Sequence, residues 1–205
     1  MAQSHRLRRI ALTGGIATGK SYVRAAFERL GVPTVDSDVL ARVAVAPGSA
    51  GLAAVVKRFG ANVLDQTGAL DRRRMAERVF TDVDTRRALE AIVHPEVRRM
   101  TDEWFASLDA NRGRYAMADI PLLYEAGRDH DFDHVIVVAC RPDTQLRRLM
   151  SRDALSETEA RQRIAAQLTI EDKVARADYV IRTDQGFEDT DRQVGVKHAQ
   201  LFGSE

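Results

Sequence analysis

Residues 8–30 have the sequence RRIALTGGIATGKSYVRAAFERL, which predicts a strand, a tight loop and a helix in that order. The apolar run at 10–13 ends in a β-branched residue and indicates a buried strand. Residues 14–21 then match the pattern G-x-x-x-x-G-K-[ST] at every fixed position. A helix is expected next, because apolar side chains recur at helical spacing at Val23, Ala26, Phe27 and Leu30. The glycine-rich loop therefore has the strand–loop–helix context that this pattern requires.

The residue types in this loop suit the binding of phosphate groups. Glycines let the backbone curl toward an anion without a Cβ clash. The helix N-terminus that follows offers free N–H groups and a favourable dipole. In this pattern the lysine reaches the terminal phosphates of a nucleotide, and the serine hydroxyl can bind Mg²⁺. We expect the whole loop to hold nucleotide through Gly14, Gly15, Ile16, Ala17, Thr18, Gly19, Lys20 and Ser21.

The overall composition restricts the class of protein. A chain of 205 residues with 44% hydrophobic residues can form one domain with insertions around a real core. The 31 basic and 30 acidic residues nearly cancel, so charge does not favour nucleic acid as a partner. Cys140 is the only cysteine, which excludes an internal disulfide and argues against a cysteine-based metal site. No apolar run reaches membrane-spanning length and the start is too short for a signal peptide, so we expect a cytoplasmic protein without a membrane partner.

Hydrophobic periodicity along the chain predicts strands that alternate with helices. Four further strands are expected at 32–36, 115–120, 134–140 and 178–181. Between the second and third strands the pattern is helical, with an interruption at His94-Pro95. A helix with an N-cap at Ser156 is expected to extend through Leu168. The alternation indicates an α/β fold with a five-stranded parallel sheet covered by helices, and with a helical insertion.

Carboxylates follow two of the predicted strands. Ligands of parallel sheets bind at the carboxyl ends of the strands, where Asp36, Asp38 and Asp119 are expected. A kinase needs a carboxylate that accepts the proton of the attacking hydroxyl, and Asp36 or Asp38 could do this or help to hold Mg²⁺. The competing interpretation is that both residues cap the helix that begins there.

Basic residues cluster on the helix that is predicted from residue 144. Arg148 and Arg152 are four residues apart and so share one helix face, with Arg147 beside them. Such a face can stabilise the charge that develops on transferring phosphates. It can equally be a solvated basic surface.

Several motifs occur in order along nearly the whole chain, and together they are more specific than the glycine-rich loop. The most specific are Asp36-Ser37-Asp38 followed by Ala41-Arg42, and Pro121-Leu122-Leu123-Tyr124-Glu125. With them occur Phe59-Gly60, His94-Pro95, Arg148, Arg152-Asp153, Gln167 and Ala177-Asp178. The ordered set resembles the dephospho-coenzyme A kinase family.

This resemblance implies a P-loop kinase fold and an ATP- and Mg²⁺-dependent reaction. The enzyme would phosphorylate the ribose 3′-hydroxyl of dephospho-coenzyme A. The domains implied are a nucleotide-binding core at 1–43, 114–140 and 171–205, a helical substrate domain at 44–113 and a mobile lid at 141–170.

The resemblance also implies roles for individual residues. Asp38 matches the proposed general base, Arg148 and Arg152 match the lid arginines, and Lys20 acts on the phosphates. Asp119 would hold Mg²⁺ through water, beside Ser21. Contacts with the substrate are implied for Asp38, Arg42, His94, Pro121, Leu122 and Glu125.

Two positions depart from the usual pattern of the family. Ala17 stands where most members have glycine, and because backbone N–H groups bind the phosphates, we expect the φ angle of Ala17 to be negative. The turn at 182–186 lacks the asparagine of many members, so no adenine contact is assigned to it.

Two other functions compete with this one. Another small-molecule or nucleoside kinase of the same fold would have the same loop. A catalytically silent nucleotide-binding module is the second, and the intact Lys20, Ser21 and Asp38 argue against it. The sequence makes no prediction of oligomeric state.

Overall fold

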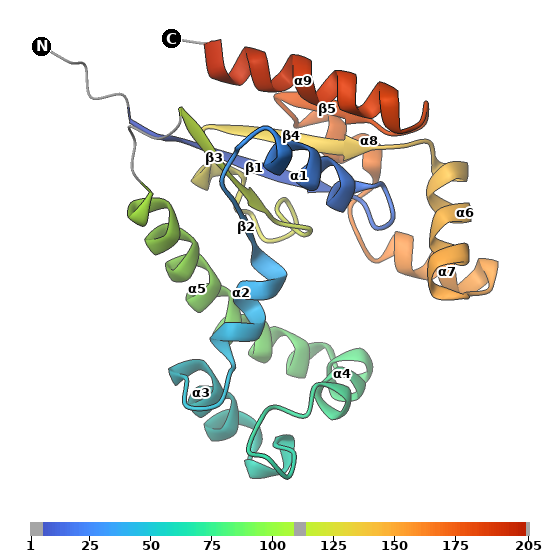
Figure 1. The fold of residues 1–205 in the computed structure, drawn as a ribbon. Helices are drawn as coiled ribbons and strands as arrows, with labels where there is room; N and C mark the ends of the chain where they lie inside the picture. The colour runs from blue at the N-terminus through green and yellow to red at the C-terminus, as the bar shows by residue number, and fades with distance from the viewer. Residues whose placement is uncertain (1–5, 109–113, 204–205) are drawn as a thin grey trace, which may run out of the picture. The chain divides into compact units, whose positions relative to one another are not determined.

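The computed structural model describes residues 6–108 and 114–203, drawn in Figure 1. The chain divides into two compact units. The first consists of Met1–Val35 and Leu108–Glu205, and the second is Asp36–Ser107. The division into core, substrate domain and lid stays a prediction, and residues 109–113 of the predicted substrate domain lie outside the described residues.

The first unit is built on a five-stranded sheet with the order β2-β3-β1-β4-β5. β1 lies in the centre, parallel to β3 and β4, and β4 is parallel to β5. All of β3 and the last five residues of β1 and β4 are buried, as expected of strands covered on both faces. The five predicted strands are confirmed as β1 (Arg8–Gly14), β2 (Thr34–Asp36), β3 (Tyr115–Asp119), β4 (His134–Ala139) and β5 (Tyr179–Arg182).

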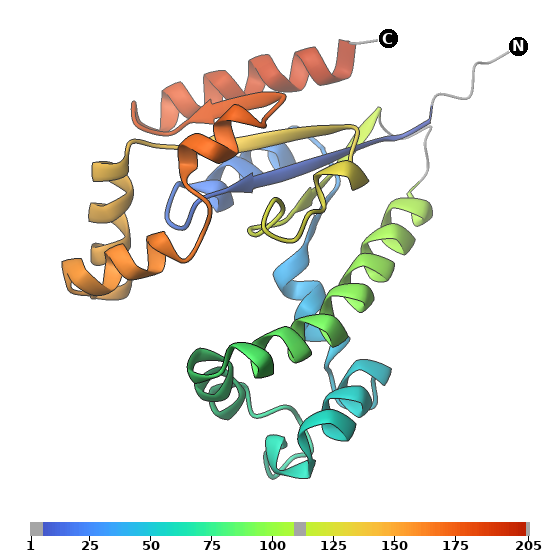
Figure 2. The same cartoon turned by 180° about the vertical axis from the view of Figure 1, so that it is seen from behind.

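Helices α1 (Lys20–Arg29) and α9 (Phe187–Gly203) pack on one face of this sheet. Alternate residues of β1, Ile10 and Leu12, point into a core shared with Phe27 of α1 and Leu201 of α9. Helix α8 (Ile170–Ala175) contacts β4, and Figure 2 shows it on the side of the sheet away from α1. Leu30, predicted on the apolar face of α1, instead caps the helix and is exposed.

The segment after β4 forms α6 (Pro142–Asp153) and α7 (Glu157–Ala165), which pack against each other. The predicted N-cap at Ser156 is confirmed, with Glu159 completing a capping box. The helix ends earlier than predicted, because Thr169 caps a separate α8 by accepting a hydrogen bond from the N–H of Asp172. Leu168 therefore lies between two helices.

The second unit is helical, with α2 (Ser37–Ala44), α3 (Ala50–Phe59), α4 (Arg72–Thr81) and α5 (Val83–Ser107). Helices α2, α3 and α4 all pack against α5, around a core that includes Val55 and Met75. A short 3₁₀ helix, η1 (Ala61–Val63), follows α3. Within the described residues between β2 and β3 there is no strand, as predicted.

The predicted interruption at His94-Pro95 is wrong, because α5 continues through Pro95 for 25 residues. A proline inside a helix removes one hydrogen bond and costs about 3 kcal/mol. Packing of α5 against three other helices offsets this local cost.

Among the described residues, no helix is long and apolar enough to cross a membrane.

Candidate active site

The phosphate loop, residues 14–21, connects β1 to α1 by a sharp turn. Gly19 is the N-cap of α1 with a φ of 92°, a left-handed conformation that glycine adopts without strain. Its carbonyl accepts hydrogen bonds from the N–H groups of Tyr22 at 3.0 Å and Val23 at 3.2 Å. A Cβ atom at Gly14 would lie 2.5 Å from the carbonyl oxygen of Val138, so the loop approaches β4 more closely than a side chain allows. The turn thus aims the N-terminus of α1 at the carboxyl ends of the strands.

Ala17 has a φ of 59°, so the expectation of a negative φ is wrong. A residue with a Cβ in this region costs about 1 kcal/mol. The cost is offset by hydrogen bonds on both sides of the alanine. The backbone N and the hydroxyl of Thr18 lie 3.3 and 2.9 Å from the carbonyl oxygen of Gly15, and Thr183 donates to the carbonyl of Thr18 at 2.7 Å.

Lys20, the first residue of α1, is held in place by Asp119, the last residue of β3. The ammonium of Lys20 forms an ion pair with one carboxylate oxygen of Asp119. Nη1 of Arg24 lies 3.3 Å from the other. The Asp119 side chain is only 2% exposed, and a buried carboxylate requires such partners. Arg24 was missed by the sequence analysis, although it lies one helical turn from Lys20 and so on the same face of α1.

The oxygen donors near the loop suit Mg²⁺. Ser21 is exposed in the first turn of α1, and the buried carboxylate of Asp119, which is paired with Lys20 and Arg24, lies at the end of β3. Mg²⁺ prefers oxygen ligands and usually takes several from phosphate and water. The described residues contain no cluster of three histidine, cysteine or acidic side chains able to hold a metal. These few oxygen atoms suit a Mg²⁺ ion that binds together with the nucleotide and takes its other ligands from phosphate and water.

Asp36 and Asp38 have different roles at the start of α2. Asp36 is the N-cap, and its Oδ1 accepts hydrogen bonds from the N–H of Asp38 at 2.8 Å and of Val39 at 3.4 Å. The capping interpretation therefore holds for Asp36. The Asp38 side chain is exposed in the first turn, and Arg42 follows one turn later on the same helix. His94 is exposed on α5, which packs against α2.

The segment 121–127 after β3 is anchored by a buried lysine. Lys173 on α8 is fully buried, and its Nζ lies 2.8 Å from Oε1 of Glu125 and 3.3 Å from the carbonyl oxygen of Pro121. The same oxygen of Glu125 accepts a hydrogen bond from the N–H of Leu168 at 3.0 Å. Pro121 and Glu125 thus have partners within the protein, whereas Leu122 is 44% exposed. No sequence signal distinguishes Lys173 from a surface lysine.

The two predicted lid arginines have different surroundings. Arg148 donates to the hydroxyl of Thr183 at 2.8 Å and to its carbonyl at 2.7 Å. Arg152 pairs at the surface with its neighbour Asp153, at 2.8 Å. Cys140 is buried, and burial raises the pKa of its thiol.

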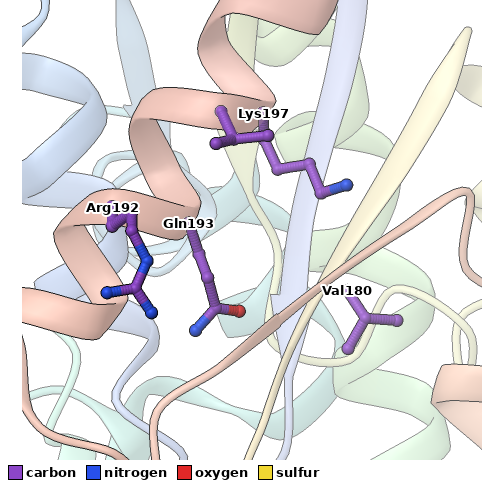
Figure 3. Close-up of a pocket in the computed structure, with 5 residues that line it drawn as sticks. Val180, Arg192, Gln193 and Lys197 are labelled. Carbon is purple, nitrogen blue, oxygen red and sulfur yellow. The ribbon is translucent and has the colours of Figure 1, made fainter.

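A pocket of about 300 Å³ lies between β5 and α9, and Figure 3 shows its polar side chains projecting from α9. It is lined by Val180, Arg192, Gln193, Val196 and Lys197, none of which belongs to the phosphate loop. Gln193 exchanges two hydrogen bonds with the backbone of Arg182, at 2.9 and 2.8 Å, and so covers the edge strand β5. The pocket is therefore separate from the candidate active site.

The combination of a phosphate loop, a paired lysine and a buried strand-end aspartate indicates a nucleotide-dependent kinase, and the comparison with known proteins specifies which family. A family model described as dephospho-CoA kinase matches residues 8–189. The chain belongs to the dephospho-CoA kinase family. A dephospho-CoA kinase of Anaeromyxobacter dehalogenans is 50% identical over 175 residues, which cover 85% of this chain and 83% of the relative. A dephospho-CoA kinase of Syntrophotalea carbinolica is 43% identical over 94% of this chain and 91% of its own length.

Solved structures agree with this family and with the predicted P-loop kinase fold. A protein of Thermus thermophilus has a TM-score of 0.82 at 35% identity, covering 97% of this chain and all of the other. Dephospho-CoA kinase from Campylobacter jejuni has a TM-score of 0.73 at 26% identity, covering 95% of this chain and 96% of the other. A shikimate kinase from Bacteroides thetaiotaomicron, at 18% identity and a TM-score of 0.55, shares the fold.

Proposed function

We propose that this chain transfers the γ-phosphoryl group of ATP to the ribose 3′-hydroxyl of dephospho-coenzyme A, giving coenzyme A and ADP. The observation that carries the proposal is the family match over residues 8–189, in a chain whose phosphate loop has Lys20 held by Asp119. The family supports the choice of substrate, and the geometry of the loop supports ATP as the phosphoryl donor.

Phosphoryl transfer depends mainly on positioning and on stabilising charge in the transition state. In this chain the N–H groups at the start of α1 and the ammonium of Lys20 would bind the phosphates. Ser21, and Asp119 through water, would hold Mg²⁺, which supplies further positive charge to the phosphate oxygens. Asp119 has a second effect, because its buried carboxylate keeps Lys20 at the mouth of the loop.

The attacking hydroxyl needs a proton acceptor, and we assign that role to Asp38. Asp36 is occupied as the cap of α2, which supports Asp38 over Asp36 as the base. Arg42 and His94, on helices that pack together, are proposed to contact the substrate. Pro121, Leu122 and Glu125 are proposed for the same purpose, with exposed Leu122 the most accessible of the three.

Arg148 and Arg152 are proposed to meet the transferring phosphate from the lid. Arg152 can do so by leaving a surface ion pair, which costs little. Arg148 would have to release Thr183 first, so its contribution depends on a change in that contact.

We propose a cytoplasmic location for the enzyme, in keeping with a lone buried thiol, and cell fractionation tests this.

The function is tested by incubating the purified chain with ATP, Mg²⁺ and dephospho-coenzyme A in a coupled assay for ADP. Parallel reactions contain a panel of nucleosides and shikimate. We expect turnover with dephospho-coenzyme A alone, and phosphorus NMR should place the new phosphate on the 3′-oxygen. Turnover of a nucleoside without turnover of dephospho-coenzyme A would favour the alternative kinase, and ATP binding without any turnover would favour the silent module.

A further inference from the structure

Two glutamine side chains contact the backbone of the phosphate loop at the same residue. Oε1 of Gln167 accepts a hydrogen bond from the N–H of Ile16 at 2.9 Å. Nε2 of Gln145 donates to the carbonyl of Ile16 at 2.8 Å. Gln145 lies on α6 and Gln167 lies between α7 and α8, so the two amides reach Ile16 from different elements. Both backbone polar groups of one loop residue are therefore bound by side chains.

The loop has room for this contact only because residue 15 is glycine. A Cβ atom at Gly15 would lie 2.6 Å from Nε2 of Gln145, a distance that real Cβ atoms essentially never show. Gln145 is itself only 5% exposed. Its amide is thus enclosed by the loop, and a buried amide of this kind requires hydrogen-bond partners.

The contact with Gln145 determines the orientation of the next peptide group. The carbonyl of Ile16 and the N–H of Ala17 belong to one planar trans peptide, so they point in opposite directions. Holding the carbonyl therefore sets the direction of the Ala17 N–H and restricts the φ angle of Ala17. That angle is 59°, which alanine resists and glycine adopts readily.

We infer that Gln145 and Gln167 are positioning residues for phosphoryl transfer, because their amides hold the Ile16 backbone so that Ala17 keeps its left-handed conformation. Without these contacts the N–H of Ala17 would be free to turn away from the phosphate side of the loop. The N–H of Ile16 is not itself a phosphate donor, because Gln167 already accepts its hydrogen bond. Thr183 secures the other side of the alanine by donating to the carbonyl of Thr18. The inference rests on the proposed function only in that ATP binds at this loop.

The inference predicts that the residue at position 17 determines how much affinity is lost when a glutamine is replaced. With alanine there, removal of the glutamine amides allows the peptide to turn away from its strained conformation. With glycine there, the left-handed conformation carries no such penalty, so the amides should matter less. The effect of losing a glutamine should therefore depend on the residue at position 17, which a double-mutant cycle measures.

The test uses Gln145→Met and Gln167→Met, since methionine keeps the length of glutamine without its hydrogen bonds. Binding of ATP and of ADP is measured by calorimetry in the absence of dephospho-coenzyme A, so the result does not depend on the identity of the acceptor. We expect each variant to weaken binding about tenfold, the scale of one lost hydrogen bond. KM for ATP should rise more than kcat falls, with circular dichroism unchanged. Gln162→Met, at an exposed position on α7, is the matched control and should bind normally.

The same glutamine substitutions are then made together with Ala17→Gly. We expect the loss of affinity to shrink to about threefold or less in that background, because glycine carries no penalty in the left-handed region. Unchanged ATP affinity in both methionine variants would overturn the inference. An equal loss with and without Ala17→Gly would also overturn it, since the glutamines would then act without the conformation of residue 17.

Discussion

Arg148 donates two hydrogen bonds to Thr183, one to its hydroxyl and one to its carbonyl, at 2.8 and 2.7 Å. Thr183 in turn donates to the carbonyl of Thr18 at 2.7 Å. An arginine on α6 is thus connected to the phosphate loop through one threonine. The connection gives Arg148 a structural role beside the proposed contact with phosphate.

The first prediction compares the two arginines on α6. Arg148→Ala should lower both the melting temperature and turnover, because it removes two partly buried hydrogen bonds worth about 1 kcal/mol each. Arg152→Ala should lower turnover without changing the melting temperature, because its surface ion pair contributes little. Thermal melts and the coupled assay measure both effects, with exposed Arg147→Ala as the control. An unchanged melting temperature for Arg148→Ala would contradict the structural role.

The second prediction concerns Lys20. Lys20→Ala should reduce turnover by roughly 10²–10³-fold, the scale of losing one preorganised charge at the reacting group. The fold should survive, because Arg24 still neutralises the buried Asp119. Coupled assay and circular dichroism together check this. Near-normal turnover in a folded variant would remove the loop from the mechanism.

The third prediction separates the two aspartates at the start of α2. Asp38→Asn should reduce turnover by roughly 10²–10⁴-fold, since asparagine cannot accept the proton of the hydroxyl. Asp36→Asn should be nearly neutral, because asparagine caps helices as well as aspartate does. Calorimetry should find ATP binding unchanged in both. The opposite ranking of turnover would identify Asp36 as the base.

The fourth prediction concerns the buried lysine. Lys173→Met should destabilise the chain by about 3 kcal/mol, because Glu125 keeps its charge and loses its cation. Adding Glu125→Gln should recover a large part of that loss, because the charge left without its partner is removed. Urea unfolding of the two single variants and the double variant measures the coupling. Additive losses would show that the ion pair does not stabilise the fold.

The fifth prediction concerns stability at alkaline pH. Burial raises the pKa of Tyr124 to about 12, from about 10 in an unfolded chain. The neutral phenol thus favours the folded state, and its contribution is complete below pH about 10 and is lost as pH rises toward about 12. Tyr124→Phe should flatten the fall in stability over this range.

The same substitution should also stabilise the protein near neutral pH. Among the described residues the buried hydroxyl of Tyr124 has no hydrogen-bond partner. Removing such a group should raise the free energy of unfolding by about 1 kcal/mol. The contact of Arg176 with the ring, 4.2 Å from its centroid, is available to phenylalanine as well. Urea unfolding at pH values from neutral to strongly alkaline checks both effects. A less stable Tyr124→Phe would imply a partner for the hydroxyl, such as an ordered water.

Some features of this protein are already determined by the sequence, because they depend on residues close together in the chain. Strand and helix periodicities repeat every two or 3.6 residues, so they predict five strands in nearly their observed positions. The glycine-rich loop and the cap at Ser156 likewise involve neighbours within a few residues. The prediction failed at Pro95, where packing of α5 outweighs a local preference against helix.

Other features are decided only by the tertiary structure, because their partners are distant in the chain. Asp119 meets Lys20 because β3 pairs with β1, which no local pattern specifies. Gln145 and Gln167 meet Ile16 only once α6 and the segment before α8 have packed near the loop. Ala17 directly follows Ile16, and its φ of 59° has the opposite sign to the one predicted from the sequence. We attribute this conformation to the contacts of the two glutamines with Ile16, as inferred above. Patterns of neighbouring residues do not contain these contacts, because the partners are brought together only when the chain folds.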